Sequence, residues 1–265
     1  MIEHWQAIAL ALIQGLTEFL PISSSAHLLL PTLLLGWPDQ GLAFDVAVHF
    51  GTLLAVLLYF RRELLRLTIG CSHALGQRQW NDEGREVLFL AVATAPAVLS
   101  GLMLNSVMDQ LRTVPVVIAT TIFFALLLAI ADRRASTGVK GVSSLGAALF
   151  IGCAQAIAPI PGTSRSGITI TAGLFLGLSR EAAARFSFLL SIPIIAGAAL
   201  LKTRDLVEAT EPVAWAQLVL GASVAAVSAY LCIALFLALV ERLGMMPFVV
   251  YRLLLGLVLA GLWWS

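Results

Sequence analysis

Residues 5–36 read WQAIALALIQGLTEFLPISSSAHLLLPTLLLG and decide what kind of fold the chain adopts. The stretch is too long for one membrane-spanning helix, which needs about 20 residues, and too short for two. Pro21 and Pro31 interrupt it, and a proline inside a helix removes a backbone hydrogen bond and introduces a clash. We therefore expect a helix, a non-helical turn and a second helix that returns to the side from which the first one entered.

A second stretch of the same kind lies at residues 144–178, where Pro159, Pro161 and Gly162 fall in the middle. Non-helical backbone at membrane depth has no water to bond to, so it is tolerated only where protein or a water-filled cavity surrounds it. Both broken regions are therefore predicted to be re-entrant helix-loop-helix segments. The turn of each is predicted to belong to a site.

The composition of the whole chain is that of an integral membrane protein. Of its 265 residues, 60% are hydrophobic and 12% are charged, and the mean hydropathy is +0.96. A soluble domain carries roughly a quarter charged residues, so a soluble enzyme and a nucleic-acid-binding protein are excluded. The sequence predicts an all-α polytopic membrane protein with two re-entrant regions and six transmembrane helices. The six apolar runs cover residues 42–60, 87–104, 114–131, 186–201, 213–240 and 247–264.

Arginine and lysine are distributed unequally between the two sets of loops that these spans define. Most of them lie in the loops at 61–86, 132–143, 179–185 and 241–246, whereas the other set holds Arg112, Lys202 and Arg204. Because cytoplasmic loops carry the excess of positive charge, the first set is expected to be cytoplasmic. Both termini and the entry of the first broken region then face the outer side, and the second broken region enters from the cytoplasmic side.

The chain also carries a faint internal repeat. Residues 21–24 (PISS) align with residues 161–164 (PGTS), and both broken regions are followed by an apolar run that ends in charges. We expect a single membrane domain, 1–265, with repeat one at approximately 1–131 and repeat two at approximately 141–265. Three spans separate the copies, so the second is inverted, an arrangement that places binding sites at the repeat interface in many transporters. The alternative is that all apolar runs resemble one another.

Glu18 is a charged residue within the first broken region, where a carboxylate at a helix centre costs about 2.5 to 3.5 kcal/mol even on lenient scales. Residues 14–27 (QGLTEFLPISSSAH) surround it with an amide, hydroxyl groups and the imidazole of His27. Gln14 shares a helix face with Glu18. Helix capping explains one serine after the proline, but it does not explain Glu18 and His27. A functional role is therefore expected here.

Arg165 is the charged residue of the second broken region, within the segment PGTSRSGIT at residues 161–169. Glycine lets backbone N–H groups approach an anion, a helix N-terminus adds a positive dipole end, and arginine supplies bidentate hydrogen bonds. We interpret the segment as a phosphate cradle. The alternative, a surface loop, is weakened because no other charge lies between Lys140 and Arg180. The residues expected to contact substrate with Arg165 are Gly162, Thr163, Ser164, Ser166 and Thr169.

The two segments quoted above closely resemble the signature segments of the undecaprenyl pyrophosphate phosphatase family, also called bacitracin resistance proteins. Residues 44–64, 185–198 and 247–252 are similar to its intervening segments. The resemblance implies removal of the terminal phosphate from a C55 polyprenyl diphosphate at the outer face of the bacterial inner membrane. It also implies recycling of the lipid carrier for peptidoglycan synthesis, bacitracin resistance, a broken-helix inverted-repeat fold and a requirement for Mg or Ca.

The resemblance further implies roles for individual residues. Ser24 resembles the family's proposed nucleophile, with His27 as general base or as proton donor to the leaving oxygen. In a second arrangement His27 is the nucleophile and the serines donate hydrogen bonds. Glu18 and Arg165 are expected to be catalytic, and Glu18 and Gln14 to bind the cation. Family members carry Glu or Gln at position 14, so the amide here puts the ligand set in question. Substrate contacts are also expected from Ser23 and Ser25.

The inverted repeat leaves a different class of function open, a polyprenyl-phosphate flippase acting with or without hydrolysis. The expected partners are the lipid substrate and the bilayer, with no nucleic acid, and a homodimer is one oligomeric state that the sequence allows. Asp45, His49 and Arg252 are assigned to helix packing or to the membrane interface. The three cysteines, Cys71, Cys153 and Cys232, are expected to be buried thiols.

Overall fold

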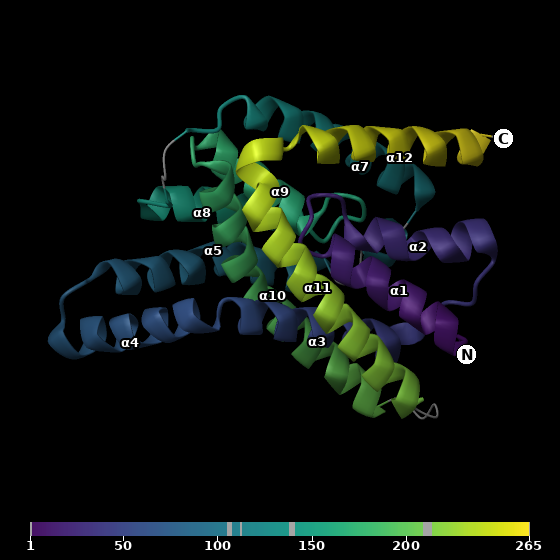
Figure 1. The fold of residues 1–265 in the computed structure, drawn as a ribbon, viewed down its shortest axis with the longest axis horizontal. Helices are drawn as coiled ribbons and strands as arrows, with labels where there is room; N and C mark the ends of the chain where they lie inside the picture. Colours follow the sequence, from purple (N-terminus) through teal and green to yellow (C-terminus); the bar gives the residue numbers. More distant parts are fainter. Residues whose placement is uncertain (1, 105–107, 112, 138–140, 209–213, 265) are drawn as a thin grey trace.

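The computed structural model describes residues 2–104, 108–111, 113–137, 141–208 and 214–264, and every regular element among them is an α-helix. Six of these helices are long and apolar enough to cross a membrane. They are α3 (Gly41–Tyr59), α5 (Asp82–Leu104), α7 (Val114–Asp132), α10 (Arg180–Glu208), α11 (Trp215–Leu243) and α12 (Met246–Trp264). Each overlaps one of the six predicted spans, so the all-α polytopic architecture is confirmed (Figure 1).

Two of these helices begin well before the apolar run that predicted them. Helix α5 starts at Asp82 and helix α10 at Arg180, because a helix continues as long as its backbone hydrogen bonds can form, whether or not lipid covers it. Asp82 and Glu181 lie in the first turns, where negative charge interacts favourably with the helix dipole. The segment 61–86, expected as a loop, contains helix α4 (Arg61–Gln77), which packs against α5.

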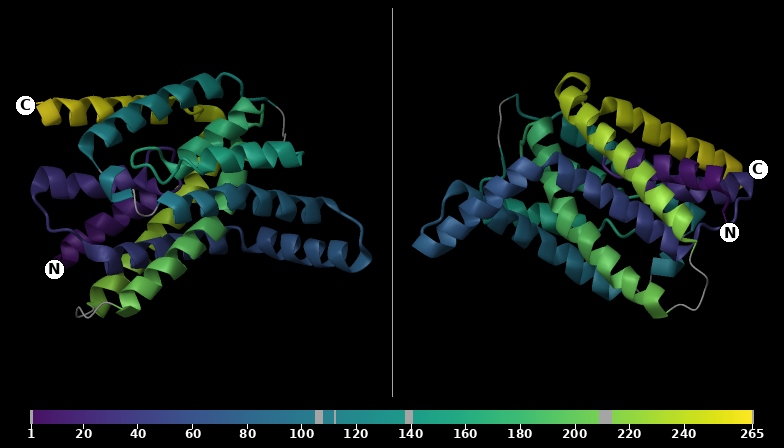
Figure 2. Two further views of the ribbon diagram at one scale, coloured as in Figure 1. Left: turned by 180° about the vertical axis from the view of Figure 1, so that it is seen from behind. Right: turned by 60° about the horizontal axis from the view of Figure 1, so that its bottom comes forward.

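Each broken region forms two short helices joined by a turn, as predicted. The first region consists of α1 (His4–Thr17) and α2 (Ser24–Leu35), and the second of α8 (Leu145–Gln155) and α9 (Arg165–Phe175); the four-residue helix α6 (Met108–Leu111) precedes α7. Figures 1 and 2 show the open ends of the two pairs on opposite sides of the molecule and their turns in its middle. The two helix pairs therefore open in opposite directions.

The largest hydrophobic core cluster joins the first broken region to the second half of the chain. Phe19, which follows Glu18, is fully buried, and its ring packs edge-on against Phe188 of α10 at a centroid distance of 5.3 Å. Phe188 in turn contacts Phe236 of α11 at 5.7 Å. Aromatic pairs of this kind stabilise by about 0.5 to 1.5 kcal/mol beyond their burial. The chain just after α1 is therefore anchored in the core.

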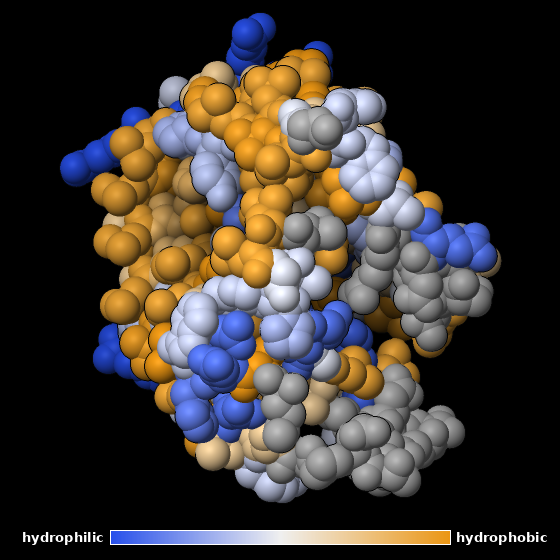
Figure 3. Space-filling model, turned by 90° about the vertical axis from the view of Figure 1, so that its right-hand side faces the viewer, coloured by the Kyte–Doolittle hydropathy of each residue, from blue (hydrophilic) through white to orange (hydrophobic). Residues whose placement is uncertain are grey.

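Large apolar side chains cover the outside of the spans, among them Leu231 and Leu257. Figure 3 views the end at which α1 begins, where hydrophobic residues dominate the flanks and hydrophilic residues gather toward the middle of the lower half. Such a wide apolar exterior is the surface that lipid covers. The expectation that all three cysteines are buried is wrong. Cys232 is buried, Cys71 is partly exposed and Cys153 of α8 is exposed, because a residue of an apolar helix can face the outside of the protein as well as its core.

Gly51 of α3 faces α11 so closely that a Cβ atom added to it would lie 2.2 Å from the carbonyl oxygen of Ala222. Gly51→Ala should therefore push the two helices apart and lower the melting temperature of the detergent-solubilised protein. Gly197→Ala in α10 is the control, because the added methyl group would meet nothing within 4 Å. That change should raise stability by up to about 1 kcal/mol. Equal melting temperatures for the two variants would contradict the close packing of α3 on α11.

Candidate functional site

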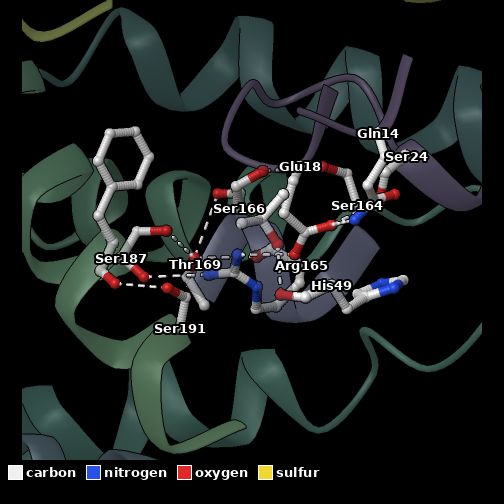
Figure 4. Close-up of polar contacts among 12 residues, drawn as sticks. Gln14, Glu18, Ser24, His49, Ser164, Arg165, Ser166, Thr169, Ser187 and Ser191 are labelled. Carbon is white, nitrogen blue, oxygen red and sulfur yellow. Dashed lines mark hydrogen bonds and ion pairs between the residues drawn. The ribbon is translucent and has the colours of Figure 1, made fainter. Parts of the chain in front are cut away.

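The turns of the two broken regions lie against each other at the centre of the molecule. We call residues 18–23 the first turn and residues 156–164 the second turn. The Oγ of Ser166 donates a hydrogen bond to the backbone oxygen of Leu20 at 2.8 Å. Beside it, Nη2 of Arg165 lies 3.2 Å from Oε1 of Glu18 (Figure 4). The two charged residues singled out in the sequence are therefore direct partners.

Glu18 accepts hydrogen bonds on both of its carboxylate oxygens. Oε1 is bonded to Arg165, and Oε2 accepts from Oγ of Ser24 at 2.8 Å and from Nε2 of Gln14 at 3.0 Å. The side chains of Glu18 and Arg165 are 8% and 11% exposed. A buried ion pair offsets the cost of desolvation only when further hydrogen bonds satisfy its remaining lone pairs. Predicted site residues supply those bonds here.

His27 is hydrogen-bonded to groups other than Ser24. Its Nδ1 lies 2.7 Å from the carbonyl oxygen of Ser23, and its Nε2 lies 2.6 Å from the hydroxyl of Tyr251, against whose ring it stacks. A carbonyl oxygen can only accept, so in the neutral imidazole Nδ1 carries the proton and Nε2 accepts from Tyr251. The lone pair of His27 on Nε2 therefore accepts from Tyr251, and the hydroxyl of Ser24 donates to Glu18 and not to His27.

Ser23 and Ser164 precede the second helix of each broken region with nearly the same unusual backbone conformation. Their φ and ψ angles are 74° and 97° for Ser23 and 70° and 111° for Ser164. Backbone of this kind in a residue other than glycine costs of order 1 to 3 kcal/mol and is found mostly at functional sites. As a result, Ser24 and Arg165 occupy equivalent places as the first residues of α2 and α9. The structural equivalence pairs Ser23 with Ser164, whereas the predicted alignment of residues 21–24 with 161–164 pairs Ser24 with Ser164, so the two differ in register by one residue.

Arg165 is held from several sides. Besides its bond to Glu18, its Nη1 donates to the carbonyl oxygen of Ser187 in α10 at 3.1 Å, and its guanidinium lies 5.9 Å from the ring centroid of Phe19. The hydroxyl of Thr169, one turn further along α9, is 2.7 Å from that of Ser187. Thr169 therefore supports the residue that orients the guanidinium.

The remaining predicted residues differ in their surroundings. The hydroxyl of Ser164 caps α9 by accepting from the backbone N–H of residue 167, and Ser166 bridges to the first turn. Thr163 is fully buried, and its hydroxyl has no hydrogen-bond partner within the described part of the chain. Ser25 is exposed, with its hydroxyl 3.2 Å from that of Ser23.

Sequence reasoning missed three residues that contact the predicted ones. Tyr251 bonds to the imidazole of His27, the backbone oxygen of Ser187 accepts from the guanidinium of Arg165, and Arg252, for which the sequence predicts only packing or an interfacial position, contacts both turns. All three lie within apolar spans, far along the chain from the residues that they contact. The available signal was their polarity at positions where polar groups are expensive. His49, drawn beside the ion pair in Figure 4, bonds through Nδ1 to a carbonyl of its own helix.

The residues around Glu18 offer oxygen ligands of the kind that Mg²⁺ and Ca²⁺ prefer. Gln14 is completely buried, and its Oε1 has no hydrogen-bond partner in the described structure. That amide oxygen lies on the residue bonded to Glu18, and the hydroxyl of Ser24 adds a third donor. No group of three or more His, Cys, Asp or Glu side chains gathers among the described residues. The oxygen atoms of Glu18, Gln14 and Ser24 therefore form a donor set of the type that a hard cation prefers.

Gly162 has a φ of +83°, and an added Cβ atom would lie 2.3 Å from Oγ1 of Thr120 and 2.8 Å from the carbonyl oxygen of Val117. Gly162→Ala should therefore distort the second turn against α7 and lower the melting temperature of the purified protein. Gly177→Ala is the control, because Gly177 has a φ of +78° but an added Cβ would meet nothing within 4 Å. It carries the backbone strain alone, about 1 to 3 kcal/mol. If Gly162→Ala were no less stable than Gly177→Ala, the turn would not be confined by α7.

The chain is similar to one family of known proteins over nearly its whole length. A family model described as "Bacitracin resistance protein BacA" matches residues 7–258. An undecaprenyl-diphosphatase of Alcanivorax borkumensis is 57% identical over 262 residues, which cover 97% of this chain and 98% of that protein. Undecaprenyl-diphosphatases of Alteromonas mediterranea and Teredinibacter turnerae are each 54% identical, over 96% and 95% of this chain and 97% and 96% of their own lengths. The similarity thus extends over nearly the whole chain.

Proposed function

The chain belongs to the bacitracin resistance protein BacA family, and we propose that it hydrolyses undecaprenyl diphosphate to undecaprenyl phosphate and inorganic phosphate. The relatives are named for this diphosphatase activity, which favours hydrolysis over a flippase that leaves the diphosphate intact. In this proposal, the reaction recycles the lipid carrier of peptidoglycan synthesis. The same recycling would account for bacitracin resistance.

The observation that carries the proposal is the hydrogen-bonded chain from Ser24 through Glu18 to Arg165, which lies between the N-termini of α2 and α9. Helix N-termini and a guanidinium both stabilise phosphate anions. Phosphoryl transfer depends mainly on positioning and on neutralising charge. The arrangement places an oxygen nucleophile, a carboxylate that can accept its proton and a group that can hold phosphoryl oxygens within direct reach of one another.

In the mechanism that we infer, Oγ of Ser24 attacks the terminal phosphorus while its proton passes to Oε2 of Glu18, 2.8 Å away. The bond from this phosphorus to the bridging oxygen breaks, and undecaprenyl phosphate leaves with the electron pair. Arg165 stabilises the charge that develops on the phosphoryl oxygens. Water then attacks the phosphoserine, inorganic phosphate leaves, and the proton held by Glu18 returns to Ser24.

His27 has a supporting role in this mechanism. Its contacts with the carbonyl of Ser23 and the hydroxyl of Tyr251 hold the first turn of α2, where Ser24 lies. The alternative, in which His27 is the nucleophile, requires Nε2 to exchange the Tyr251 hydroxyl for the phosphorus. A hydroxyl nucleophile is activated by an adjacent base, and Ser24 already has one in Glu18.

Protein purified in detergent should release inorganic phosphate from undecaprenyl diphosphate, and Ser24→Ala should reduce the rate to background because the nucleophile is lost. Transport needs two compartments and hydrolysis does not, so phosphate release in detergent separates the two functions. Ser191→Ala is the control, since this buried serine of α10 bonds to the carbonyl of Phe188 in its own helix, and it should retain activity. Full turnover by Ser24→Ala together with an inactive His27→Ala would transfer the nucleophile to His27.

We propose that Glu18 and Oε1 of Gln14 would hold a divalent cation, Mg²⁺ or Ca²⁺, next to the diphosphate of the substrate. The positive charge of Arg165 is balanced by Glu18, so this pair offers little net charge to a diphosphate that carries several negative charges. When bound, the cation would neutralise charge on the phosphate oxygens. The unpartnered amide oxygen of Gln14 supports this assignment.

Substitutions at the two proposed ligands should change cation binding in opposite directions. Glu18→Gln should abolish hydrolysis and weaken Ca²⁺ binding measured by titration calorimetry in the presence of inorganic phosphate, because a hard anionic ligand is lost. Gln14→Glu should tighten that binding by adding a second carboxylate. If Glu18→Gln bound Ca²⁺ as tightly as the unaltered protein, the carboxylate would have no place in a cation site.

We propose that the site opens to the outer side of the bacterial inner membrane. The first residues of α10, which carry Arg180 and Arg185, and the start of α8 lie on the side of the molecule opposite the open end of α1 and α2 (Figure 1). The positive-inside rule assigns the basic loops to the cytoplasm, so α1 and α2 enter from outside as a re-entrant pair. Charged groups cross hydrocarbon at a cost of several kcal/mol, and the diphosphate therefore reaches the site from the outer face.

Single cysteines in a Cys-free protein test this orientation. Asp39→Cys, at an exposed position between α2 and α3, should react with a membrane-impermeant thiol reagent in intact spheroplasts. Arg78→Cys, at an exposed position after α4, should react only after lysis. Labelling of Arg78→Cys in sealed cells, with Asp39→Cys protected, would reverse the topology.

A further inference from the structure

The largest side chain that is completely buried in the described structure belongs to Arg252 of α12. Its Nε donates to the carbonyl oxygen of Thr121 in α7 at 3.2 Å, its Nη1 to that of Pro21 at 3.2 Å, and its Nη2 to that of Gly162 at 2.8 Å. Two further bonds from Nη2 reach the carbonyl oxygens of Thr163 and Thr120 at 3.2 and 3.5 Å. One guanidinium thus bonds to the first turn, the second turn and α7.

Arg252 differs from the other buried or half-buried arginines in what balances its charge. Arg165 pairs with Glu18, and Arg180 pairs with Asp132, whereas no carboxylate of the described residues forms an ion pair with Arg252. A buried charge costs several kcal/mol unless close partners compensate it. Here the partners are carbonyl dipoles from three segments, so the charge is stable only while those segments stay together.

The carbonyl groups that Arg252 binds in the two turns belong to backbone that lies outside helices. At membrane depth an unpaired carbonyl costs several kcal/mol, so the turns need a donor as much as the guanidinium needs acceptors. Arginine presents five N–H groups in one plane, whereas lysine carries its three on a single nitrogen. Only the wider group reaches carbonyl oxygens of both turns at once.

We propose that Arg252 is a positioning residue for the hydrolysis reaction, one that fixes the distance between the nucleophile and the phosphate cradle. This inference rests on the proposed function. Pro21 lies three residues before Ser24, and Gly162 lies three residues before Arg165. Any separation of the two carbonyl oxygens is therefore transmitted to the reacting groups. A misplacement of about 1 Å costs roughly 100-fold in rate.

The residue next to Arg252 acts on the same part of the molecule. Tyr251 donates its hydroxyl to His27 in α2 at 2.6 Å, and the two rings stack at a centroid distance of 5.5 Å. Helix α12 itself packs along α7, to which Arg252 also bonds. Two consecutive residues of α12 therefore tie the first broken region, the second turn and α7 into one unit.

The test compares Arg252→Lys with Arg180→Lys, a control in which an arginine at the distant start of α10 loses its bond to Asp132. Two measurements are made on detergent-solubilised protein: hydrogen exchange by mass spectrometry, and kcat and KM for phosphate release. Arg252→Lys should exchange faster in peptides covering residues 18–24 and 160–166, and its kcat should fall by about 100-fold with KM little changed. Arg180→Lys should lower the melting temperature without changing exchange in the turns or kcat.

Each alternative result has a distinct meaning. Unchanged exchange in both turns of Arg252→Lys would overturn the positioning role, whatever the activity. Faster exchange with normal kcat would show that the spacing of the turns does not limit the reaction, and it would also overturn the proposal. An equal fall in kcat for Arg180→Lys would show that the loss of activity comes from lower stability of the whole protein, and it would overturn the positioning role. Absence of phosphate release by the unaltered protein would instead refute the proposed function, while the exchange data would still decide whether Arg252 joins the turns.

Discussion

The structure depends on one constraint, which is that the polar backbone groups of two non-helical turns must be paired inside a protein whose exterior is apolar. Side chains from distant segments supply the donors: Ser166 to Leu20, Thr120 to Pro161 and Arg252 to both turns. Separating the turns would break the bond from Ser166 to Leu20, and Arg252 could no longer bond to both turns at once. The constraint that makes broken helices expensive thus also holds the turns in fixed positions, which is what a reaction centre requires.

The charges of the site obey the same constraint. Glu18 and Arg165 are each too costly to bury alone, and as a hydrogen-bonded pair they balance each other. Because the pair is neutral, the phosphate of the proposed substrate would have to compete with Glu18 for the guanidinium or bring a cation with it. Without a ligand, the ion pair holds the carboxylate and the guanidinium in fixed orientations. In the proposed reaction, the charge of the bound ligand would change the electrostatic balance between them.

The six spans and the two broken regions could be predicted because hydrophobic run length and proline position are local properties of the sequence. Glu18 and Arg165 stood out for a similar reason, as lone charges in apolar surroundings. The pairing of Ser24 with Glu18, and of His27 with Tyr251, could not be predicted, because it depends on how turns and helices remote in sequence pack. Helix α4 was not predicted because its residues are as polar as those of a loop. The contacts of Arg252 were not predicted because its partners are backbone carbonyl oxygens, which every residue has and which no particular side chain reveals.

Ser23 and Ser164 share an unusual backbone conformation, but the residues that follow them differ in chemistry. Ser24 follows Ser23 and carries a hydroxyl, whereas Arg165 follows Ser164 and carries a guanidinium. For the proposed reaction, a pair of identical turns would offer two nucleophiles with no guanidinium, or two guanidinium groups with no nucleophile. In the proposed mechanism Ser24 and Arg165 have different roles, so the two turns could not replace each other even though their backbone conformations match at Ser23 and Ser164.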